Sequence, residues 1–296
     1  MTYKKIEDGF YPALGTPTNS EGKLILSSFR KQIELMIDAG AKGVLCMGSM
    51  GKMASISDRE YSGVAKQCVE NVSQKVPVMV GVMDCSVSRV LDRVEALGDI
   101  KIDGVVATVP YYYKLSSNEI INFFKQLSKK SKYPVYIYDL PSVTQAPVTF
   151  EIMEALADIP NIKGIKTGNI TLIREIQRSN YRNDAFSVLY SGLDLFDIAL
   201  NSGIRKNLDG MFTCTPFNSK KLYENLEQNS LKTNSIYLSN ILNLRNIFLK
   251  ESVFSAYSYA MELLGCPGDY HPDYSLPISE KLKKEIYNFM KTIKEI

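Results

Sequence analysis

The chain has 296 residues, a net charge of +3 at pH 7 and a hydrophobic content of 45%. This length fits two ordinary domains or one large α/β barrel, and the composition supports a sizeable core. Because lysine and arginine form no dense tract and no apolar run reaches about 18 residues, neither nucleic acid nor a membrane is expected as a partner.

Short β-rich segments alternate with amphipathic stretches along most of the chain. The expected strands are Phe10–Leu14, Gly43–Met47, Val76–Val82, Gly104–Val109, Val135–Asp139, Ile162–Lys166, Phe186–Ser191 and Gly210–Thr213. The expected helices between them include Ser27–Ala39, Asp58–Asn71, Val87–Leu97, Glu119–Lys129, Phe150–Ala157 and Leu172–Arg178. Such alternation implies a parallel sheet with right-handed crossovers, and the mostly apolar strands suit a sheet covered on both faces. Eight units favour a TIM (β/α)8 barrel.

From about Ser219 onward, the sequence pattern predicts helices and no further strands. Three helices are expected there, Ser235–Leu249, Ser252–Leu264 and Ser279–Ile296, and Ser279 follows Pro277 as an N-cap. We therefore predict a barrel over residues 1–218 and a C-terminal helical region packed on it over residues 219–296. An open dinucleotide-binding sheet is disfavoured, because "PALGTPTNSEG" after the first strand is not a GxGxxG loop.

Cysteine and histidine usage limits the possible chemistry. The cysteines are odd in number, and their spacings match neither CxxC pairs nor a disulfide framework. They are Cys46, Cys68, Cys85, Cys214 and Cys266. This pattern favours a reducing, cytoplasmic setting. The sole histidine, His271, cannot build a histidine-rich metal site, and no nucleophile-elbow motif lies near it.

Functional residues of such a barrel lie at the C-terminal ends of its strands. Lys166 ends the apolar run that begins at Ile162. One reading is a strand-end lysine paired with a carboxylate. The other is a catalytic amine, because loss of solvation disfavours the charged form of a lysine and a neutral amine attacks a ketone to form a Schiff base.

Other strand ends supply hydroxyl groups. Tyr138 stands 28 residues before Lys166, about one βα unit, so the two residues are expected on adjacent strands. Its phenol could shuttle protons, or its ring could simply cap a barrel layer. The run Tyr111–Tyr113 is expected to face a pocket or a partner chain. The "GSMG" turn at Gly48–Gly51 could hold a carboxylate, although such turns are common in ordinary loops.

Together these motifs resemble the dihydrodipicolinate synthase / N-acetylneuraminate lyase family of class I, Schiff-base aldolases. "GSMGK" stands where the family has G-(S/T)-T-G-E, and "PYYYK" where it has P-Y-Y-N. "YDLPS" stands for Y-N-x-P, "GIKTGN" for G-x-K with a polar turn, and "SGLD" for S-G-x-D. The likeness extends from "FYPALGTP" at 10–17 to the "LPIS" entry to the last helix.

The resemblance implies a role for each matching residue. Lys166 would form the Schiff base with pyruvate or another 2-keto acid, and Tyr138 would transfer protons. Tyr112 would be offered across a dimer interface, and Ser49 would link the two phenols. The residues expected to line the substrate site are Met50, Gly48, Asp194, Gly192, Thr167 and Phe212. No metal or organic cofactor is expected, and the implied assembly is a homo-oligomer, a dimer of dimers.

The departures from the family pattern bear on the substrate. Met50 replaces a threonine whose hydroxyl helps to bind the keto-acid carboxylate, and Lys52 replaces a glutamate. Val143 stands where the synthases have an arginine that grips aspartate semialdehyde, and valine makes no such contact. Leu195 after Asp194 argues against sialic acid itself.

We therefore expect a lyase or aldolase that acts on pyruvate and a 2-keto sugar acid by reversible C–C cleavage. Two alternatives remain open. The first is a synthase or dehydratase that uses the same iminium. The second is a non-catalytic homologue that binds 2-keto acids.

Overall fold

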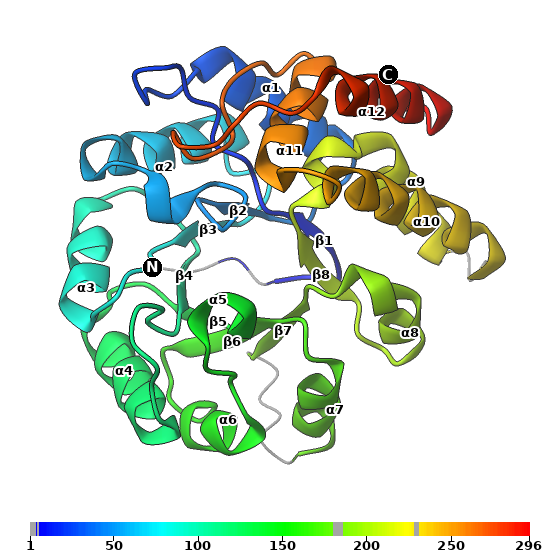
Figure 1. The fold of residues 1–296 in the computed structure, drawn as a ribbon. Helices are drawn as coiled ribbons and strands as arrows, with labels where there is room; N and C mark the ends of the chain where they lie inside the picture. The colour runs from blue at the N-terminus through cyan, green and yellow to red at the C-terminus, as the bar shows by residue number, and fades with distance from the viewer. Residues whose placement is uncertain (1–3, 5, 180–185, 228–230) are drawn as a thin grey trace.

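The computed structural model describes residues 4, 6–179, 186–227 and 231–296. These residues form a ring of eight parallel strands surrounded by helices (Figure 1). The strands are β1 (Gly9–Pro12), β2 (Val44–Cys46), β3 (Val78–Gly81), β4 (Gly104–Thr108), β5 (Val135–Tyr138), β6 (Ile162–Thr167), β7 (Ser187–Tyr190) and β8 (Lys206–Asp209). Neighbours pair in sequence order, β8 pairs with β1, and a bridge between Ala13 and Leu45 joins β1 to β2. The expected TIM barrel is confirmed.

Large aromatic side chains fill the barrel because glycines stand beside them. A Cβ atom at Gly43 would lie 2.4 Å from the ring of Tyr11. The ring of Tyr136 lies similarly close to Gly104 and Gly164, where an added Cβ would come within 2.6 and 2.8 Å of it. Both tyrosines are buried, so these rings fill the interior with packed side chains.

The helices that follow the strands agree closely with the six expected ones, and one further helix, between β7 and β8, was not among them. They are α1 (Leu26–Asp38), α2 (Asp58–Val72), α3 (Val87–Ala96), α4 (Ser117–Lys130), α6 (Phe150–Leu156), α7 (Ile170–Arg178) and α8 (Phe196–Asn201). α4 begins before the expected Glu119, because Ser116 and Glu119 form a capping box at its start. Short turns α5 (Pro141–Thr144), η1 (Met53–Ser55), η2 (Leu193–Leu195) and η3 (Met211–Cys214) follow strand ends and were not foreseen.

The eighth strand was predicted wrongly at Gly210–Thr213. The strand is the preceding polar segment Lys206–Asp209, and the apolar residues after it form η3. Asp209 Oδ1 accepts a hydrogen bond from the Met211 amide at 2.8 Å, and the Thr213 hydroxyl donates to the Gly210 carbonyl at 2.6 Å. These bonds turn the chain back on itself, so the apolar run cannot continue as a strand.

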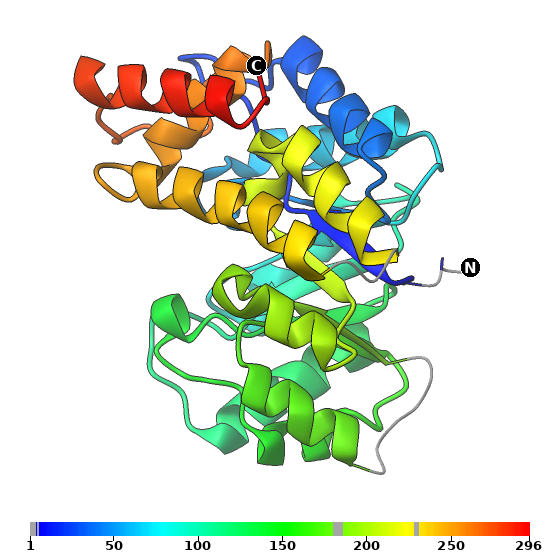
Figure 2. The same ribbon diagram turned by 90° about the vertical axis from the view of Figure 1, so that its right-hand side faces the viewer.

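The C-terminal part of the chain is helical, as expected. It contains α9 (Pro216–Glu227), α10 (Leu231–Phe248), α11 (Val253–Leu263) and α12 (Glu280–Thr292), which stack beside the barrel next to α1 (Figures 1 and 2). α9 was not foreseen as a separate helix, and α12 ends before the expected Ile296. Ser279 is the predicted N-cap, since its hydroxyl accepts from the Leu282 amide at 3.2 Å. The division at residue 218 stays a prediction.

Two further features bear on the sequence-based expectations. All five cysteines, each within the described ranges, are free. Within the same ranges, no helix combines the length and apolar character that a membrane crossing requires.

Candidate active site

Lys166 and Tyr138 lie side by side at the C-terminal ends of β6 and β5. The two residues are register partners in the sheet, which confirms that they stand on adjacent strands. Lys166 is 6% exposed, and its Nζ lies 3.8 Å from the centre of the Tyr138 ring. A buried amine held over an aromatic face is fixed in position and largely removed from water.

Ser49 reaches the same point from the turn after β2. Its Oγ lies 3.3 Å from the hydroxyl of Tyr138, somewhat longer than the usual O–H···O distance of about 2.5–3.0 Å, so the contact is a weak hydrogen bond. The chain thus brings three of its expected catalytic residues together, with an amine over one side of a phenol ring and a hydroxyl at the end of that ring. Such an arrangement can hold a carbonyl compound on the amine and move a proton along the two hydroxyls.

Tyr112 is not brought into this group within one chain. It is 72% exposed, and its ring packs edge-on against Tyr113 at a centroid distance of 4.9 Å. Tyr111, by contrast, is half-buried, and burial together with a hydrogen bond to Cys85 raises its pKa to about 12. The three adjacent tyrosines therefore divide into one inward residue and two that present their rings to solvent.

Two of the expected substrate-binding positions lie in the turn that carries Ser49. Gly48 is buried, and a Cβ atom there would lie 2.8 Å from a methyl carbon of Leu45. Met50 is half-buried and packs on the end of β8, since a Cβ atom at Gly210 would lie 2.1 Å from the Met50 Cγ. The thioether side chain therefore covers backbone at the barrel mouth, and it offers no hydroxyl donor.

Asp194, after β7, is held by an arginine that sequence reasoning missed. Arg245, in the last turn of α10, donates two hydrogen bonds to the Asp194 carboxylate at 2.6 and 2.8 Å. These bonds hold the pKa of Asp194 below its ordinary value. Gly192 is packed against the Tyr190 ring, where a Cβ atom would lie 2.3 Å from the phenol oxygen. The charge of Asp194 is therefore already matched before any substrate arrives.

The remaining two expected residues are not brought to Lys166. Thr167 follows Lys166 in the strand, so its side chain points to the opposite face, and its hydroxyl donates to Asp139 at 2.6 Å. Phe212 is fully buried and packs edge-on against Phe10 at 5.3 Å. Both residues support the framework of the site.

The structure adds two residues to which the sequence analysis assigned no role. Asp139 is buried, and its amide donates to the Lys166 carbonyl at 2.9 Å, which ties the two strand ends together. Thr108 is the register partner of Tyr138 on β4, and among the described residues its buried hydroxyl has no hydrogen-bond partner. The position of Asp139, directly after Tyr138, could have indicated its role, whereas no sequence signal identifies Thr108.

Lys52 does not point toward Lys166. Its Nζ donates to the Thr18 hydroxyl at 2.6 Å and to the carbonyls of Asp269 and His271 at 2.7 and 3.3 Å. Burial lowers its pKa to about 8. Across the described ranges, no three histidine, cysteine, aspartate or glutamate side chains are grouped so that they could hold a metal ion.

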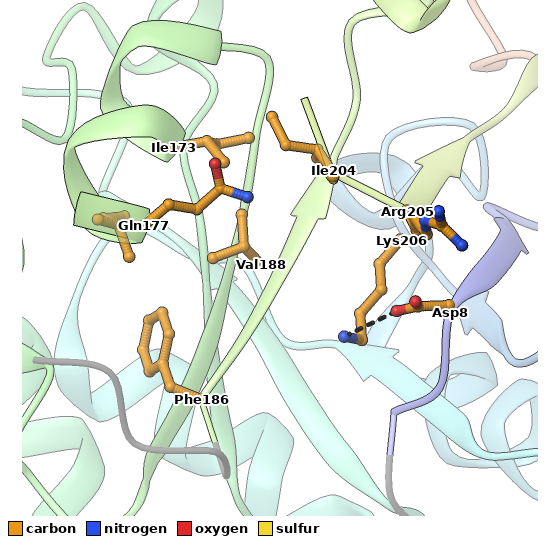
Figure 3. A pocket seen from close by; sticks show the side chains of 10 residues that line it. Asp8, Ile173, Gln177, Phe186, Val188, Ile204, Arg205 and Lys206 are labelled. Atoms are coloured by element: carbon orange, nitrogen blue, oxygen red, sulfur yellow. Dashed lines mark ion pairs between the residues drawn. The ribbon is translucent and has the colours of Figure 1, made fainter. Parts of the chain in front are cut away.

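A small pocket between α7 and the strands β7 and β8 offers a different kind of surface (Figure 3). Its volume is about 110 Å³, and Lys206 pairs there with Asp8 at 3.2 Å beside apolar residues such as Ile173 and Phe186. Lys206 and Asp8 lie at the N-terminal ends of β8 and β1, opposite to Lys166. Catalytic groups of such barrels lie at the other end, so the Lys166 cluster is the better candidate.

Comparison with known proteins agrees with this geometry. The model of the dihydrodipicolinate synthetase family matches residues 7–296. The 4-hydroxy-tetrahydrodipicolinate synthase of Wigglesworthia glossinidia brevipalpis is 26% identical over 292 residues, or 97% of this chain and 96% of that protein. The enzyme of the same name from Neisseria gonorrhoeae is 28% identical over 277 residues, or 91% and 92%.

Solved structures share the fold at low identity. The prophage protein YagE of E. coli K12, from the dihydrodipicolinic acid synthase family and in complex with pyruvate, superposes with a TM-score of 0.88 at 23% identity, covering 98% of this chain and 99% of that one. Dihydrodipicolinate synthase from Thermotoga maritima gives 0.89 at 21% identity, covering 98% and 100%. Since the family match spans nearly the whole chain, the protein belongs to the dihydrodipicolinate synthetase family and is an aldolase-type lyase.

Proposed function

We propose that the enzyme forms a Schiff base at Lys166 and reversibly cleaves a 2-keto sugar acid to pyruvate and an aldehyde. The observation that carries this proposal is the buried Lys166 amine over the ring of Tyr138, whose hydroxyl meets Ser49. These three residues supply a nucleophile and a proton route within one small volume. The complex of YagE with pyruvate, a protein of the same family, is consistent with a keto-acid substrate.

The reaction uses these groups in order. The Lys166 amine attacks the C2 carbonyl of the keto acid, and loss of water leaves a protonated imine. Tyr138 accepts the C4 hydroxyl proton as its own proton passes to Ser49, and the exposed Ser49 hydroxyl passes its own proton to water. The C3–C4 bond then breaks, C4 leaves as the aldehyde, and the electron pair moves into the imine to give an enamine. The proton returns to C3, and water releases pyruvate from the lysine.

The charges around the strand ends favour an uncharged aldehyde. Val143, in α5, is 52% exposed and provides no cation for a carboxylate. Lys52 is turned toward other oxygens, and Arg245 is occupied by Asp194. An aldehyde that carries a carboxylate would have to displace one of these contacts, whereas a hydroxyaldehyde needs only hydrogen bonds.

We propose further that Tyr112 joins the proton route of a second copy of the chain. Its exposed ring and that of Tyr113 form an aromatic surface, of the kind that is enriched in interfaces. The working unit would then be at least a dimer, and by family likeness a dimer of dimers. Association would place the third hydroxyl where the single chain lacks it.

Borohydride trapping tests the nucleophile. Incubation with pyruvate and borohydride should add one reduced pyruvyl group per chain, mapped by peptide mass to Lys166. The adduct should disappear in Lys166→Ala and persist in Lys163→Ala, a lysine of the same strand at its other end. An adduct that survives Lys166→Ala would refute the assignment.

A second candidate function is 4-hydroxy-tetrahydrodipicolinate synthase, favoured by the names of the similar relatives. It uses the same lysine, so the aldehyde partner must discriminate. Pyruvate should be assayed with glyceraldehyde, which is neutral, and with aspartate semialdehyde, which is charged. We expect condensation with the neutral aldehyde. A kcat/KM of about 10⁴ M⁻¹s⁻¹ or more with aspartate semialdehyde would instead establish the synthase.

A further inference from the structure

Lys52 lies in the turn that carries Ser49. Its backbone is left-handed, with φ of 46°, and its amide donates to the Ser49 carbonyl at 3.0 Å. The next amide, of Met53, donates to the Gly48 carbonyl at 3.2 Å. Left-handed backbone is uncommon for a residue other than glycine, so a contact from outside the turn that holds Lys52 there helps to offset its cost.

The side chain of Lys52 provides that hold. Lys52 is 8% exposed, and its ammonium donates to three oxygens, the Thr18 hydroxyl and the carbonyls of Asp269 and His271. Thr18 and Asp269 also exchange backbone hydrogen bonds at 2.9 and 3.1 Å. One buried charge thus joins the Ser49 turn to the loop after β1 and to the segment between α11 and α12.

We propose that Lys52 is a positioning residue, whose ammonium fixes the turn so that the Ser49 hydroxyl stays within reach of Tyr138. The inference rests on the proposed function, in which those two hydroxyls carry the proton. Their separation of 3.3 Å leaves little room for displacement, because two such groups are no longer hydrogen-bonded at about 3.6 Å. The family motif that this turn resembles has a glutamate at this position, and the contacts of Lys52 are what support the proposed role.

The role depends on the charge of the amine. An ammonium has three protons for its three oxygens, whereas a neutral amine has two, so deprotonation removes at least one donated hydrogen bond and the charge that strengthens the others. Burial lowers the pKa of Lys52 to about 8, although the carboxylates of Asp269 and Asp273 oppose this effect. His271, whose Nε2 lies 3.7 Å from Asp269, is a further titratable group on that segment, and the facing Thr18 carries no charge. The segment also carries the titratable side chains of Cys266, Tyr270 and Tyr274.

Turnover against pH, from 6.5 to 9.5, tests the proposal when borohydride trapping of pyruvate is measured in parallel. Wild-type turnover should fall as the pH rises through about 8. Lys52→Met should lose about tenfold in kcat and lose this pH dependence, while trapping at Lys166 persists. Lys52→Arg, which stays charged, should restore turnover at high pH. Thr18→Val, which removes one acceptor, should move the fall to lower pH.

The matched control is Lys206→Met, which removes a lysine from the Asp8 pair at the opposite end of the barrel and should leave kcat and its pH profile unchanged (Figure 3). If wild-type protein traps no pyruvate, the proposed function fails and this inference falls with it. If trapping occurs but Lys52→Met keeps wild-type turnover and pH profile, only the positioning role is refuted. If either Lys52 variant does not fold, Thr18→Val still tests the role. A pH profile of Thr18→Val turnover that matches the wild type would also refute it.

Discussion

Glu295 should make the stability of this enzyme depend on pH. Its carboxylate accepts hydrogen bonds from the amides of Phe217 and Asn218 at 2.9 and 3.0 Å, and from the Asn218 side chain at 2.7 Å. It thereby caps the first turn of α9. Burial raises the pKa of Glu295 from 4.5 to about 7, against the effect of these bonds. The cost of enclosing the charge therefore exceeds the gain from the cap.

The sign and size of the effect follow from linkage. Since the folded state holds this proton more tightly, the contribution to the free energy of unfolding is complete below pH 4.5 and is lost as the pH rises through about 7. The whole effect is at most about 3 kcal/mol, of which about 2 kcal/mol falls between pH 5.5 and 8. For a chain of this size, 2 kcal/mol corresponds to a Tm difference of roughly 3 °C.

Glu295→Gln removes the titration and keeps an acceptor oxygen. We expect the Tm of the wild type relative to this variant to be roughly 3 °C higher at pH 5.5 than at pH 8. Glu154→Gln, on the exposed side of α6, serves as the control for loss of a glutamate charge. A Tm difference between wild type and Glu295→Gln that stays constant over this pH range would refute the reasoning.

Four substitutions at the barrel mouth give three further tests. Tyr138→Phe keeps the ring beside Lys166 but not the proton carrier, so turnover should fall by about 10²–10⁴-fold while borohydride trapping of pyruvate persists. Mixed oligomers of Tyr112→Phe and Lys166→Ala chains should recover activity that neither variant has alone, and no recovery would show that Tyr112 does not act across an interface. Thr108→Val removes a buried hydroxyl that has no partner in the described part of the chain, so urea unfolding should show a gain of about 1 kcal/mol. A loss of stability would mean that the hydroxyl is bound after all.

The barrel could be predicted from sequence because its strands are apolar and regularly spaced. The same spacing placed Tyr138 and Lys166 on adjacent strands, and their register pairing bears this out. β8 was not predicted because its sequence, "KNLD", is mostly polar, although Leu208 and Asn207 are buried. A strand whose neighbours cover it can bury a polar side chain, and hydrophobicity alone does not reveal such a strand.

The surroundings of the site could be predicted less well than its centre. Alternation along β6 already implies that Thr167 faces away from Lys166, so that placement was available from the pattern. The contact between Arg245 and Asp194 could not be predicted from the pattern. Arg245 lies on α10, and the position of this helix against the barrel depends on the whole fold. The partners of Lys52 are equally remote in sequence, since Thr18 and Asp269 lie on opposite sides of it.

The C-terminal helical region supports the catalytic end of the barrel through charged groups. It supplies Arg245 to Asp194, and it supplies the carbonyls of Asp269 and His271 to Lys52. Removing the region would take away two of the three oxygens that accept hydrogen bonds from Lys52. A buried polar group left without its partners lowers the free energy of unfolding by more than the lost hydrogen bonds had contributed. For this reason we expect residues 1–218 not to act as an independent enzyme, even though they contain Ser49, Tyr138 and Lys166.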